Sequence, residues 1–445
     1  MSKTFAEIPA VQFTGTDIMS GTFAMLQAQM ALKHGPIYKW PISEGPEAGQ
    51  EFVFMVGPEA NRFVLHTHRE HFSHALGWTP LVGESLGTGL LNMDDPEHAR
   101  HRKMWNPAFA GPFMEGYLPV IQQVIAQRTT TWPAQGTVDV VNECREITFD
   151  AAAAALAGFR PGPEVDRLRE LFYVLLHGFE IEVDSWDAFV ARYMGAQQEL
   201  SATLLGMIAA RRAMPATEPA RDVLAMIVRA RDEQGQGLTD EQVLGHVNIL
   251  LVAGHETTTT LGAWVLYLLA TQPEQRARVE AELDGLLGAG NLPLTVEAVR
   301  GMKYLDQFIR EAGRLYPPVV NVPRGVVRDF EFGGYTVPAG TGMRLALGAG
   351  HLLPTVFPDP ERFDPDRFAP PRDEDKQPYA LVTFGGGPRI CIGINFAQIE
   401  VKALAAHVLR HYHLEAATQH GVHAGHWNAF IPGGIPLHVT PRQRA

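Results

Sequence analysis

The sequence predicts a mainly α-helical fold with small β-sheets, built as a single large domain over residues 1–445. Helical periodicity dominates residues 115–315, and extended segments punctuated by turns lie nearer the ends. The hydrophobic content of 46% is enough for a chain of 445 residues to bury a large core. No internal repeat and no long low-complexity linker divides the chain, which favours one continuous unit.

The extended segments predict the small sheets. The first is EFVFMVG at 51–57, and the second is FEFGGYTVPAGTGMRLAL at 330–347. A proline-rich, charged stretch at 369–378 reads as a short loop.

One predicted helix is unusually long. Thr239 and Gln242 have the spacing of a capping box, and Pro273 sets the far limit, so we expect a helix over residues 240–271. At about 1.5 Å per residue this helix would be roughly 48 Å long. It would cross the whole domain.

Two apolar runs of this helix flank a polar centre, His255, Glu256 and the threonines at 257–260. A membrane span is disfavoured, because neither run approaches the roughly 20 apolar residues required and Glu256 would lie near the bilayer centre. A helix that is apolar nearly all round is buried in protein, so its polar groups need partners such as water, a ligand or other side chains. This mid-core polarity is the first functional indication.

Composition excludes several functions. The net charge of −12 provides no electrostatic footprint for nucleic acid. The N-terminus has no basic segment followed by an apolar run, so we expect no signal peptide and a cytoplasmic location. With only two cysteines, the chain cannot build a four-thiolate metal or iron–sulfur site.

Cys391 stands in a glycine-rich loop, TFGGGPRICIG, at 383–393. A thiolate is a strongly electron-donating axial ligand for haem iron, and the glycines would let the backbone approach a flat macrocycle. Arg389 could pair with a propionate of such a group. The alternative is a structural cysteine buried in a glycine turn.

The spacing Phe384-x-x-Gly-x-Arg389-x-Cys391-x-Gly393 resembles the haem-ligand loop of the cytochrome P450 family, and Ala397 and Glu400 continue the resemblance into the next helix. The resemblance extends over most of the chain. It implies haem b as cofactor, Cys391 as the iron ligand, and Phe384, Arg389 and Gly393 as parts of the haem site.

The stretch AGHETT at 253–258 is similar to the family's oxygen-activation segment. The resemblance places Ala253 beside the haem and gives the acid–alcohol roles in proton delivery to Glu256 and Thr257. His255 is expected to face neighbouring helices, and Thr259 and Thr260 receive no role.

Other motifs carry supporting roles by the same resemblance. Glu311 and Arg314 in EAGR, alone an ordinary i,i+3 pair, are expected to join Arg367 of PDRF in a buried network that supports haem incorporation. His98 and Arg102 in one predicted helix, and Arg324, are expected to bind the haem propionates together with Arg389. A zinc site at His98 is the competing idea, but no second ligand cluster accompanies it.

The implied reaction inserts one oxygen atom from O2 into a lipophilic organic substrate, by hydroxylation or epoxidation. Electrons would come indirectly from NAD(P)H through a separate ferredoxin or flavodoxin-type donor, for which Arg100, Lys103 and Lys402 are candidate docking cations. The alternatives are a peroxide-using peroxygenase of the same fold, whose members typically lack the acid–alcohol pair, and a non-catalytic haem sensor or carrier.

The segments that surround the family's substrate pocket are overwhelmingly apolar here. Apolar side chains reward lipophilic ligands and penalise unpaired charge, so a terpenoid, steroid or fatty-acyl-like substrate is expected. The candidate pocket residues are Leu86, Leu90, Phe172, Leu176, Val320, Val322, Phe430 and Ile431. Cys144 matches no functional position and is expected to be a small buried side chain on a helix.

Overall fold

The computed structural model describes residues 2–42, 49–177, 185–288, 292–417 and 434–442. The chain forms two compact units. Unit 1 comprises residues 1–77, 130–144 and 257–445, and unit 2 comprises 78–129 and 145–256. The predicted assignment of residues 1–445 to one haem-binding domain stays a prediction.

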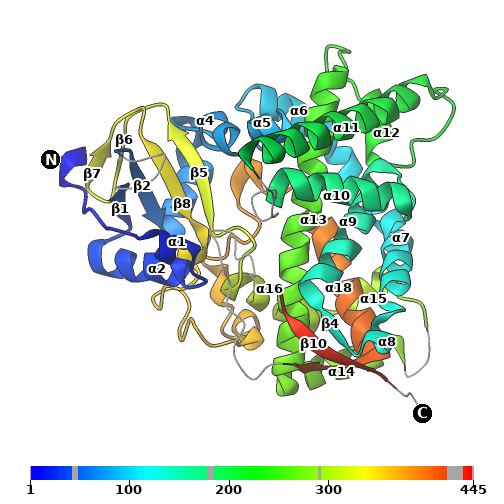
Figure 1. Ribbon diagram of the computed structural model, residues 1–445. Helices are drawn as coiled ribbons and strands as arrows, with labels where there is room; N and C mark the ends of the chain where they lie inside the picture. Colours follow the sequence, from blue (N-terminus) through cyan, green and yellow to red (C-terminus); the bar gives the residue numbers. More distant parts are fainter. Residues whose placement is uncertain (1, 43–48, 178–184, 289–291, 418–433, 443–445) are drawn as a thin grey trace. The chain divides into compact units, whose positions relative to one another are not determined.

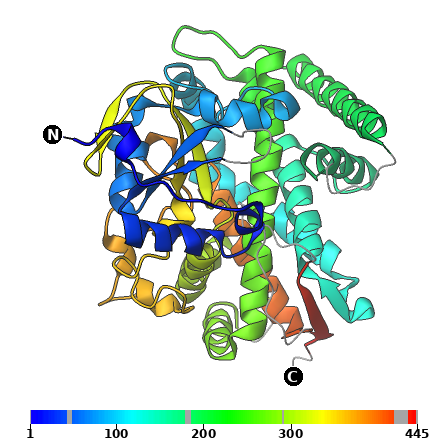
Figure 2. The same ribbon diagram turned by 60° about the vertical axis from the view of Figure 1, so that its left-hand side comes forward.

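Unit 1 contains the sheets, and Figures 1 and 2 show strands from both ends of its sequence side by side. Its five-stranded sheet has the order β1-β2-β8-β5-β3, formed by Ile37–Pro41, Glu51–Val56, Gly342–Ala346, Asn321–Val326 and Phe72–Ser73. A three-stranded sheet joins β4 (Thr137–Asp139), β10 (Pro436–Pro441) and β9 (Tyr412–Ala416), and a hairpin joins β6 (Phe330–Phe332) to β7 (Tyr335–Val337). The predicted extended segments at 51–57 and 330–347 are therefore confirmed.

Unit 1 also contains helices. They are α1 Gly15–Met19, α2 Phe23–His34, α3 Pro58–Arg62, α4 His74–Trp78, α8 Trp132–Gln135, α14 Pro273–Leu287, α15 Val296–Gly301, α16 Lys303–Leu315, α17 Leu347–Gly350 and α18 Ile394–His411. Short helical turns lie at Phe5–Glu7, Phe63–Thr67, Arg69–His71, Pro365–Phe368, Glu374–Lys376 and Gly387–Arg389.

Unit 2 is helical. It holds α5 Glu84–Leu86, α6 Glu97–Trp105, α7 Gly111–Thr129, α10 Pro163–His177, α11 Trp186–Ala213 and α12 Val223–Arg229, with short turns at Thr79–Gly83 and Asn106–Phe109. Helices α10 and α11 run side by side (Figure 1). Helices α9 (Val140–Ala157) and α13 (Asp240–Thr271) belong to both units.

Helix α13 has the predicted bounds, Asp240–Thr271. The capping box forms, since the Thr239 N–H donates to Gln242 Oε1 at 3.0 Å and the Gln242 N–H donates to Thr239 Oγ1 at 3.2 Å. Glycine at 245 permits close packing in unit 2, because a Cβ there would lie 2.3 Å from the carbonyl oxygen of Thr88. Farther along, in unit 1, Gly262 faces Leu404 and the buried Cys144, which confirms the expected structural role of that cysteine.

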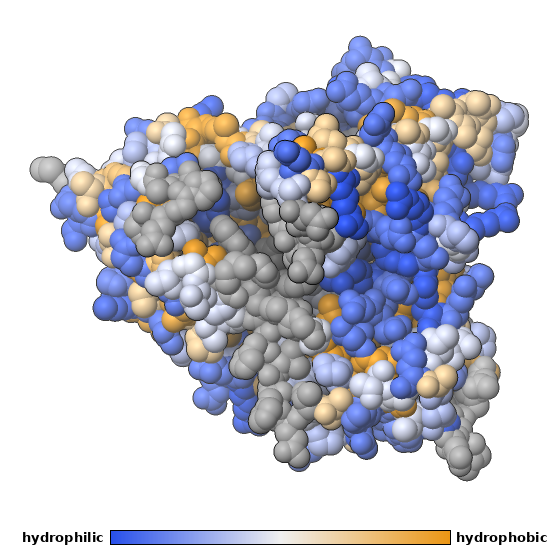
Figure 3. All heavy atoms as spheres, viewed as in Figure 1, coloured by the Kyte–Doolittle hydropathy of each residue, from blue (hydrophilic) through white to orange (hydrophobic). Residues whose placement is uncertain are grey.

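Polar and apolar residues are interspersed over the visible faces of both units (Figure 3). No helix in the described part of the chain combines the length and the apolarity that a membrane crossing requires.

Candidate functional site

The cysteine loop of unit 1 is a tight turn that ends at the start of α18. The Cys391 N–H donates to the Phe384 carbonyl at 3.0 Å, and Cys391 is exposed. Gly387 has φ +64°, and a Cβ there would lie 2.1 Å from the carbonyl oxygen of Leu65. Only glycine fits that position, because both the left-handed backbone and the close approach exclude a side chain.

The exposed sulfur two residues before the N-cap of α18 is chemically suited to a haem ligand. Gly393 caps α18, and the partial positive charge of a helix N-terminus favours a thiolate nearby. A Cβ at Gly393 would lie 3.9 Å from Cys391 Sγ, so glycine at this position keeps a side chain away from the sulfur. Among the residues that the structure describes, no three His, Cys, Asp or Glu side chains gather as a metal site. The exposed Cys391 sulfur in its glycine-rich turn fits a group that needs one protein thiolate.

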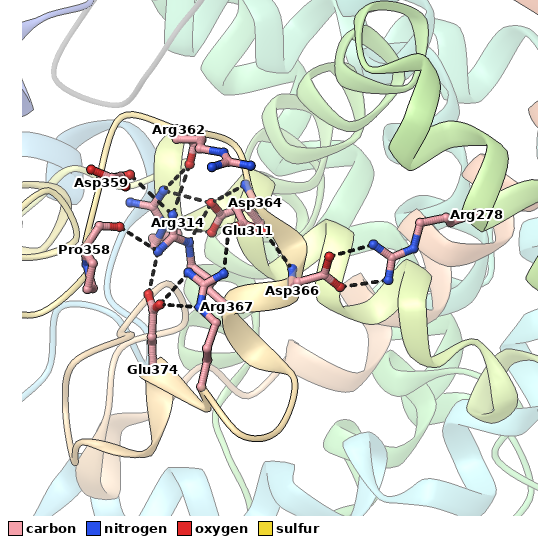
Figure 4. Close-up of polar contacts among 11 residues, drawn as sticks. Arg278, Glu311, Arg314, Pro358, Asp359, Arg362, Asp364, Asp366, Arg367 and Glu374 are labelled. Carbon is pink, nitrogen blue, oxygen red and sulfur yellow. Dashed lines mark hydrogen bonds and ion pairs between the residues drawn. The ribbon is translucent and has the colours of Figure 1, made fainter.

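A buried ion network lies in the same unit, as the sequence predicts (Figure 4). Glu311 accepts from Arg314 Nε at 2.7 Å and from Arg367 Nε at 2.9 Å, and all three side chains are fully buried. The Asp364 N–H also donates to Glu311 Oε1 at 2.9 Å. The prediction missed Glu374, a second carboxylate that binds Arg367 at 2.5 Å.

His351 connects this network to the cysteine loop. Arg314 Nη1 donates to the His351 carbonyl at 2.9 Å, and His351 Nε2 accepts from the Val382 N–H at 3.0 Å. Burial, with the nearby Arg314, lowers the pKa of His351 to about 3, so the ring is neutral and can accept. The sequence carried no signal for this contact, which joins residues 31 positions apart.

The predicted propionate ligands are divided between the units. Arg324 on β5 is 5% exposed and donates to the Pro323 carbonyl at 2.6 Å, and Arg389 is half-buried in the cysteine loop. In unit 2, His98 and Arg102 lie one turn apart on α6, with His98 Nδ1 3.4 Å from Asp95 Oδ1 and Arg102 donating to Asn106 Oδ1 at 2.9 Å. Their joint role stays a prediction.

The polar centre of α13 lies where the sequence predicts. Ala253 and Thr257, four residues apart, share one face, and Ala253 is exposed. His255 is 2% exposed and packs edge-on against Phe149 of α9, with ring centroids 5.0 Å apart, so it faces a neighbouring helix as expected.

Glu256 has partners that sequence reasoning missed. Its Oε1 lies 3.2 Å from His177 Nε2 on α10 and 3.1 Å from His255 Nε2. Burial works to raise the pKa of Glu256, but the hydrogen bonds from His177 and His255 outweigh it and hold that pKa well below its usual range. The carboxylate is therefore ionised at neutral pH.

The pocket candidates are apolar and mostly packed. Leu86, Phe172 and Val320 are at most 5% exposed, and Leu90, Leu176 and Val322 are half-buried. Phe172 packs against Phe149 with ring centroids 5.8 Å apart. Phe430 and Ile431 lie outside the described residues.

The structure corrects one member of the predicted set of docking cations, Lys402, and the role of Arg100 and Lys103 stays a prediction. Arg100 pairs with Asp232 at 2.7 Å, and Lys103 pairs with Glu233. Lys402 pairs with Asp306 at 2.7 Å and its side chain is only 10% exposed. Lys402 therefore presents little charge at the surface, whereas the side chains of Arg100 and Lys103 are 35% and 71% exposed.

Glu400 of α18 allows a stability test. It is fully buried, and neither carboxylate oxygen has a hydrogen-bond partner among the described residues. Burial raises its pKa well above the usual range, so the folded state keeps a proton that the unfolded state releases above about pH 4.3. Stability should then fall as pH rises above that value, by up to about 1.4 kcal/mol per pH unit, until the folded-state pKa is passed.

We expect Glu400→Gln to remove this slope. Urea unfolding at pH 5, 6 and 7 should show a gain in stability over wild type that grows with pH. Glu415→Gln, at an exposed position on β9, is the control and should leave the slope unchanged. A slope that persists in Glu400→Gln would contradict the expectation.

Comparison with known proteins agrees with this geometry. The family model described as Cytochrome P450 matches residues 10–425. A Mycobacterium tuberculosis chain named as cytochrome P450 136 is 29% identical over 98% of this chain and 89% of its own length. A sterol 14alpha-demethylase of Mycolicibacterium vanbaalenii is 28% identical over 83% of each chain.

A solved structure described as retinoic acid bound cyanobacterial CYP120A1 has the same fold. Its TM-score is 0.82 at 27% identity, and the match covers 98% of this chain and 99% of the other. The match of the family model over nearly the whole chain carries the assignment. The chain therefore belongs to the cytochrome P450 family and is a haem-dependent oxidoreductase of the monooxygenase type.

Proposed function

We propose that this chain uses O2 to insert one oxygen atom into a lipophilic substrate, by hydroxylation or epoxidation. One oxygen atom enters the substrate, and two electrons and two protons reduce the other to water. The observation that supports O2 use is the ionised Glu256 beside Thr257 on α13, held by hydrogen bonds from two histidines. A peroxygenase or a haem carrier has no need for such an arrangement.

Haem b, when bound, supplies the redox centre that activates O2. We propose that Cys391 Sγ holds the iron and that the cysteine loop, with Phe384 and Gly393, shapes that side of the site. Four cationic or hydrogen-bonding side chains would hold the propionates: His98, Arg102, Arg324 and Arg389. The Glu311–Arg314–Arg367 network would support haem incorporation by holding the segments around the cysteine loop in place.

Protons must reach the oxygen that becomes water. We propose that the Thr257 hydroxyl orients this transfer and that Glu256, one residue earlier on α13, supplies the negative charge that organises it. Ala253, four residues before Thr257 on the same face, carries too small a side chain to obstruct access.

The substrate we propose is a terpenoid, steroid or fatty-acyl-like molecule. The candidate lining of Leu86, Leu90, Phe172, Leu176, Val320 and Val322 is wholly apolar, which favours a sizeable lipophilic ligand. Two similar proteins are named for such molecules, a sterol and retinoic acid. A carboxylate on the substrate would have to reach water, because an unpaired buried charge is costly.

We also propose that electrons come from NAD(P)H through a separate ferredoxin or flavodoxin-type protein, in the cytoplasm. Arg100 and Lys103 stay candidates for the docking surface, whereas Lys402 is nearly buried against Asp306.

The decisive experiment combines binding with turnover. Terpenoids, steroids and fatty acids are first ranked against small polar aromatics and sugars by the Soret shift of the ferric protein. The tightest ligand is then incubated with O2, NAD(P)H and a generic ferredoxin system, or with peroxide alone. Oxygenated product only with O2 supports the proposal, product only with peroxide identifies a peroxygenase, and binding without product identifies a carrier.

Thr257→Ala should retain haem and fold but lose coupling. Without the hydroxyl, electrons should leave as hydrogen peroxide or excess water, so the product-to-NAD(P)H ratio should fall more than NAD(P)H consumption. Thr260→Ala, on the same helix, is the control. An unchanged ratio in Thr257→Ala would remove this hydroxyl from the mechanism.

A further inference from the structure

The carboxylate of Glu256 is the meeting point of three described elements of unit 2. Its Oε1 lies 3.2 Å from His177 Nε2 of α10, 3.1 Å from His255 Nε2 of α13, and 3.8 Å from Arg145 Nε of α9. Tyr173 of α10 completes the surroundings, because its ring lies under the Arg145 guanidinium at 5.7 Å and beside the His177 ring at 5.0 Å. One carboxylate therefore faces two imidazoles and a guanidinium.

The hydrogen bonds of His255 show where its protons lie. Nδ1 is 2.7 Å from the Leu251 carbonyl, and a carbonyl only accepts, so Nδ1 carries a proton. The contact from Nε2 to Glu256 Oε1 then needs a proton of its own. The hydrogen bonds from its histidine partners hold the pKa of Glu256 well below its usual range, so the carboxylate is the acceptor in this contact.

A carboxylate in this state cannot be the resting proton store for the reaction. The exchangeable proton nearest to the Glu256 carboxylate must therefore lie on one of the side chains that contact it. Arg145 does not release protons at ordinary pH. Of the two histidines, His255 is the more enclosed, with a side chain 3% exposed against 13% for His177.

The charges around His177 suit a reversible proton carrier. Glu256 favours the imidazolium, whereas the guanidinium of Arg145 and a cationic His255 oppose it. Charges of opposite sign therefore act on His177 from its surroundings. Its place at the end of α10 gives it more access to water than the enclosed His255 has.

We propose that His177 is a positioning residue that loads protons for the acid–alcohol pair. This role rests on the proposed monooxygenase function. The Nε2 proton of the His177 imidazolium passes to Glu256 Oε1, the proton leaves that oxygen toward the Thr257 side of α13, and the imidazole takes a new proton from water. Two such cycles would deliver the two protons that one turnover consumes.

The first test measures the electrostatic coupling between His177 and Glu256 in the absence of turnover. In the reduced, CO-saturated full-length protein labelled at histidine Cε1, the His177 signal is assigned by its disappearance in His177→Gln, and its titration is followed with pH. Glu256→Gln should move the midpoint of this titration to lower pH by about one unit, a tenfold change in the ionisation constant. Glu241→Gln, in the first turn of the same helix, should leave it in place.

The second test measures how efficiently NAD(P)H consumption is coupled to product formation. Glutamine at 177 keeps an N–H donor for Glu256 but cannot carry a proton, whereas alanine removes both. If His177 loads protons, both His177→Gln and His177→Ala should lower the product-to-NAD(P)H ratio, by up to about 100-fold, and lose the wild-type pH dependence. His438→Gln, at an exposed histidine on β10, is the control and should behave as wild type.

The outcomes separate this proposal from the proposed function. An unmoved midpoint of the His177 titration in Glu256→Gln would overturn proton loading by His177. Wild-type coupling in His177→Gln, with a loss only in His177→Ala, would also overturn it and would show that His177 acts only as a hydrogen-bond donor. If no substrate is oxygenated under any condition, the monooxygenase proposal fails, and the titration still reports whether the two residues are coupled.

Discussion

Alanine at position 391 should abolish the red-shifted Soret band that the reduced, CO-saturated protein is expected to show. That band requires a thiolate opposite CO, and Cys391 is the exposed cysteine, held in a loop with its N–H bonded to the Phe384 carbonyl. Alanine removes the sulfur while leaving this backbone bond available. Oxygenation should also be lost, since thiolate donation is what favours O–O cleavage.

Cys144→Ala is the matched control for this result. Cys144 is fully buried in α9, so its removal should cost some packing energy and leave the spectrum intact. Circular dichroism would confirm that both variants fold. The assignment fails if the band is lost in Cys144→Ala and kept in Cys391→Ala.

Glu311→Gln should be strongly destabilising, with a loss of about 3–5 kcal/mol in the free energy of unfolding. The substitution removes the negative charge to which Arg314 and Arg367 both donate, and leaves two buried guanidinium groups with less compensation. It also replaces one of the two carboxylate oxygens by an amide NH2, which must then face either Arg314 Nε or the Asp364 N–H, both of them donors. Urea unfolding would measure the loss, and a reduced ratio of Soret to protein absorbance would show poorer haem incorporation.

Asp366→Asn makes the same chemical change in an exposed pair. Asp366 binds Arg278 through two contacts of 2.6 and 2.8 Å, with side chains 45% and 52% exposed (Figure 4). Water screens such pairs, so the loss should stay below about 1 kcal/mol. Equal losses in Glu311→Gln and Asp366→Asn would show that burial of the network does not set its contribution.

The sequence predicted those elements whose formation depends on residues only a few positions apart. The bounds of α13 follow from a capping box and a proline, both within a few residues of the helix ends. The turn before Cys391 follows from glycine, since only glycine tolerates the backbone at Gly387. The Glu311–Arg314 pair is one helical turn, so its contact is visible in the spacing alone.

Contacts between distant segments were not visible in the same way. Lys402 was expected on a docking surface, but the fold buries it against Asp306, which lies 96 positions away. The sequence predicts Glu374 only as part of a charged loop, but in the structure its carboxylate forms a second ion pair with Arg367. The sequence shows that a residue is charged but not whether the fold buries it. Burial decides whether the charge lies on the surface or in a buried ion network.

The sequence by itself determined the family, the main helices and strands, and the candidate cysteine, because these depend on residue type and on spacings of a few positions. Only the tertiary structure decided that the carboxylate of Glu256 is ionised and that a histidine 79 positions earlier holds it. The physical reason is that a pKa depends on which charges and donors surround a group in space, and on how much water the fold excludes from it. The identity of neighbouring residues along the chain determines neither.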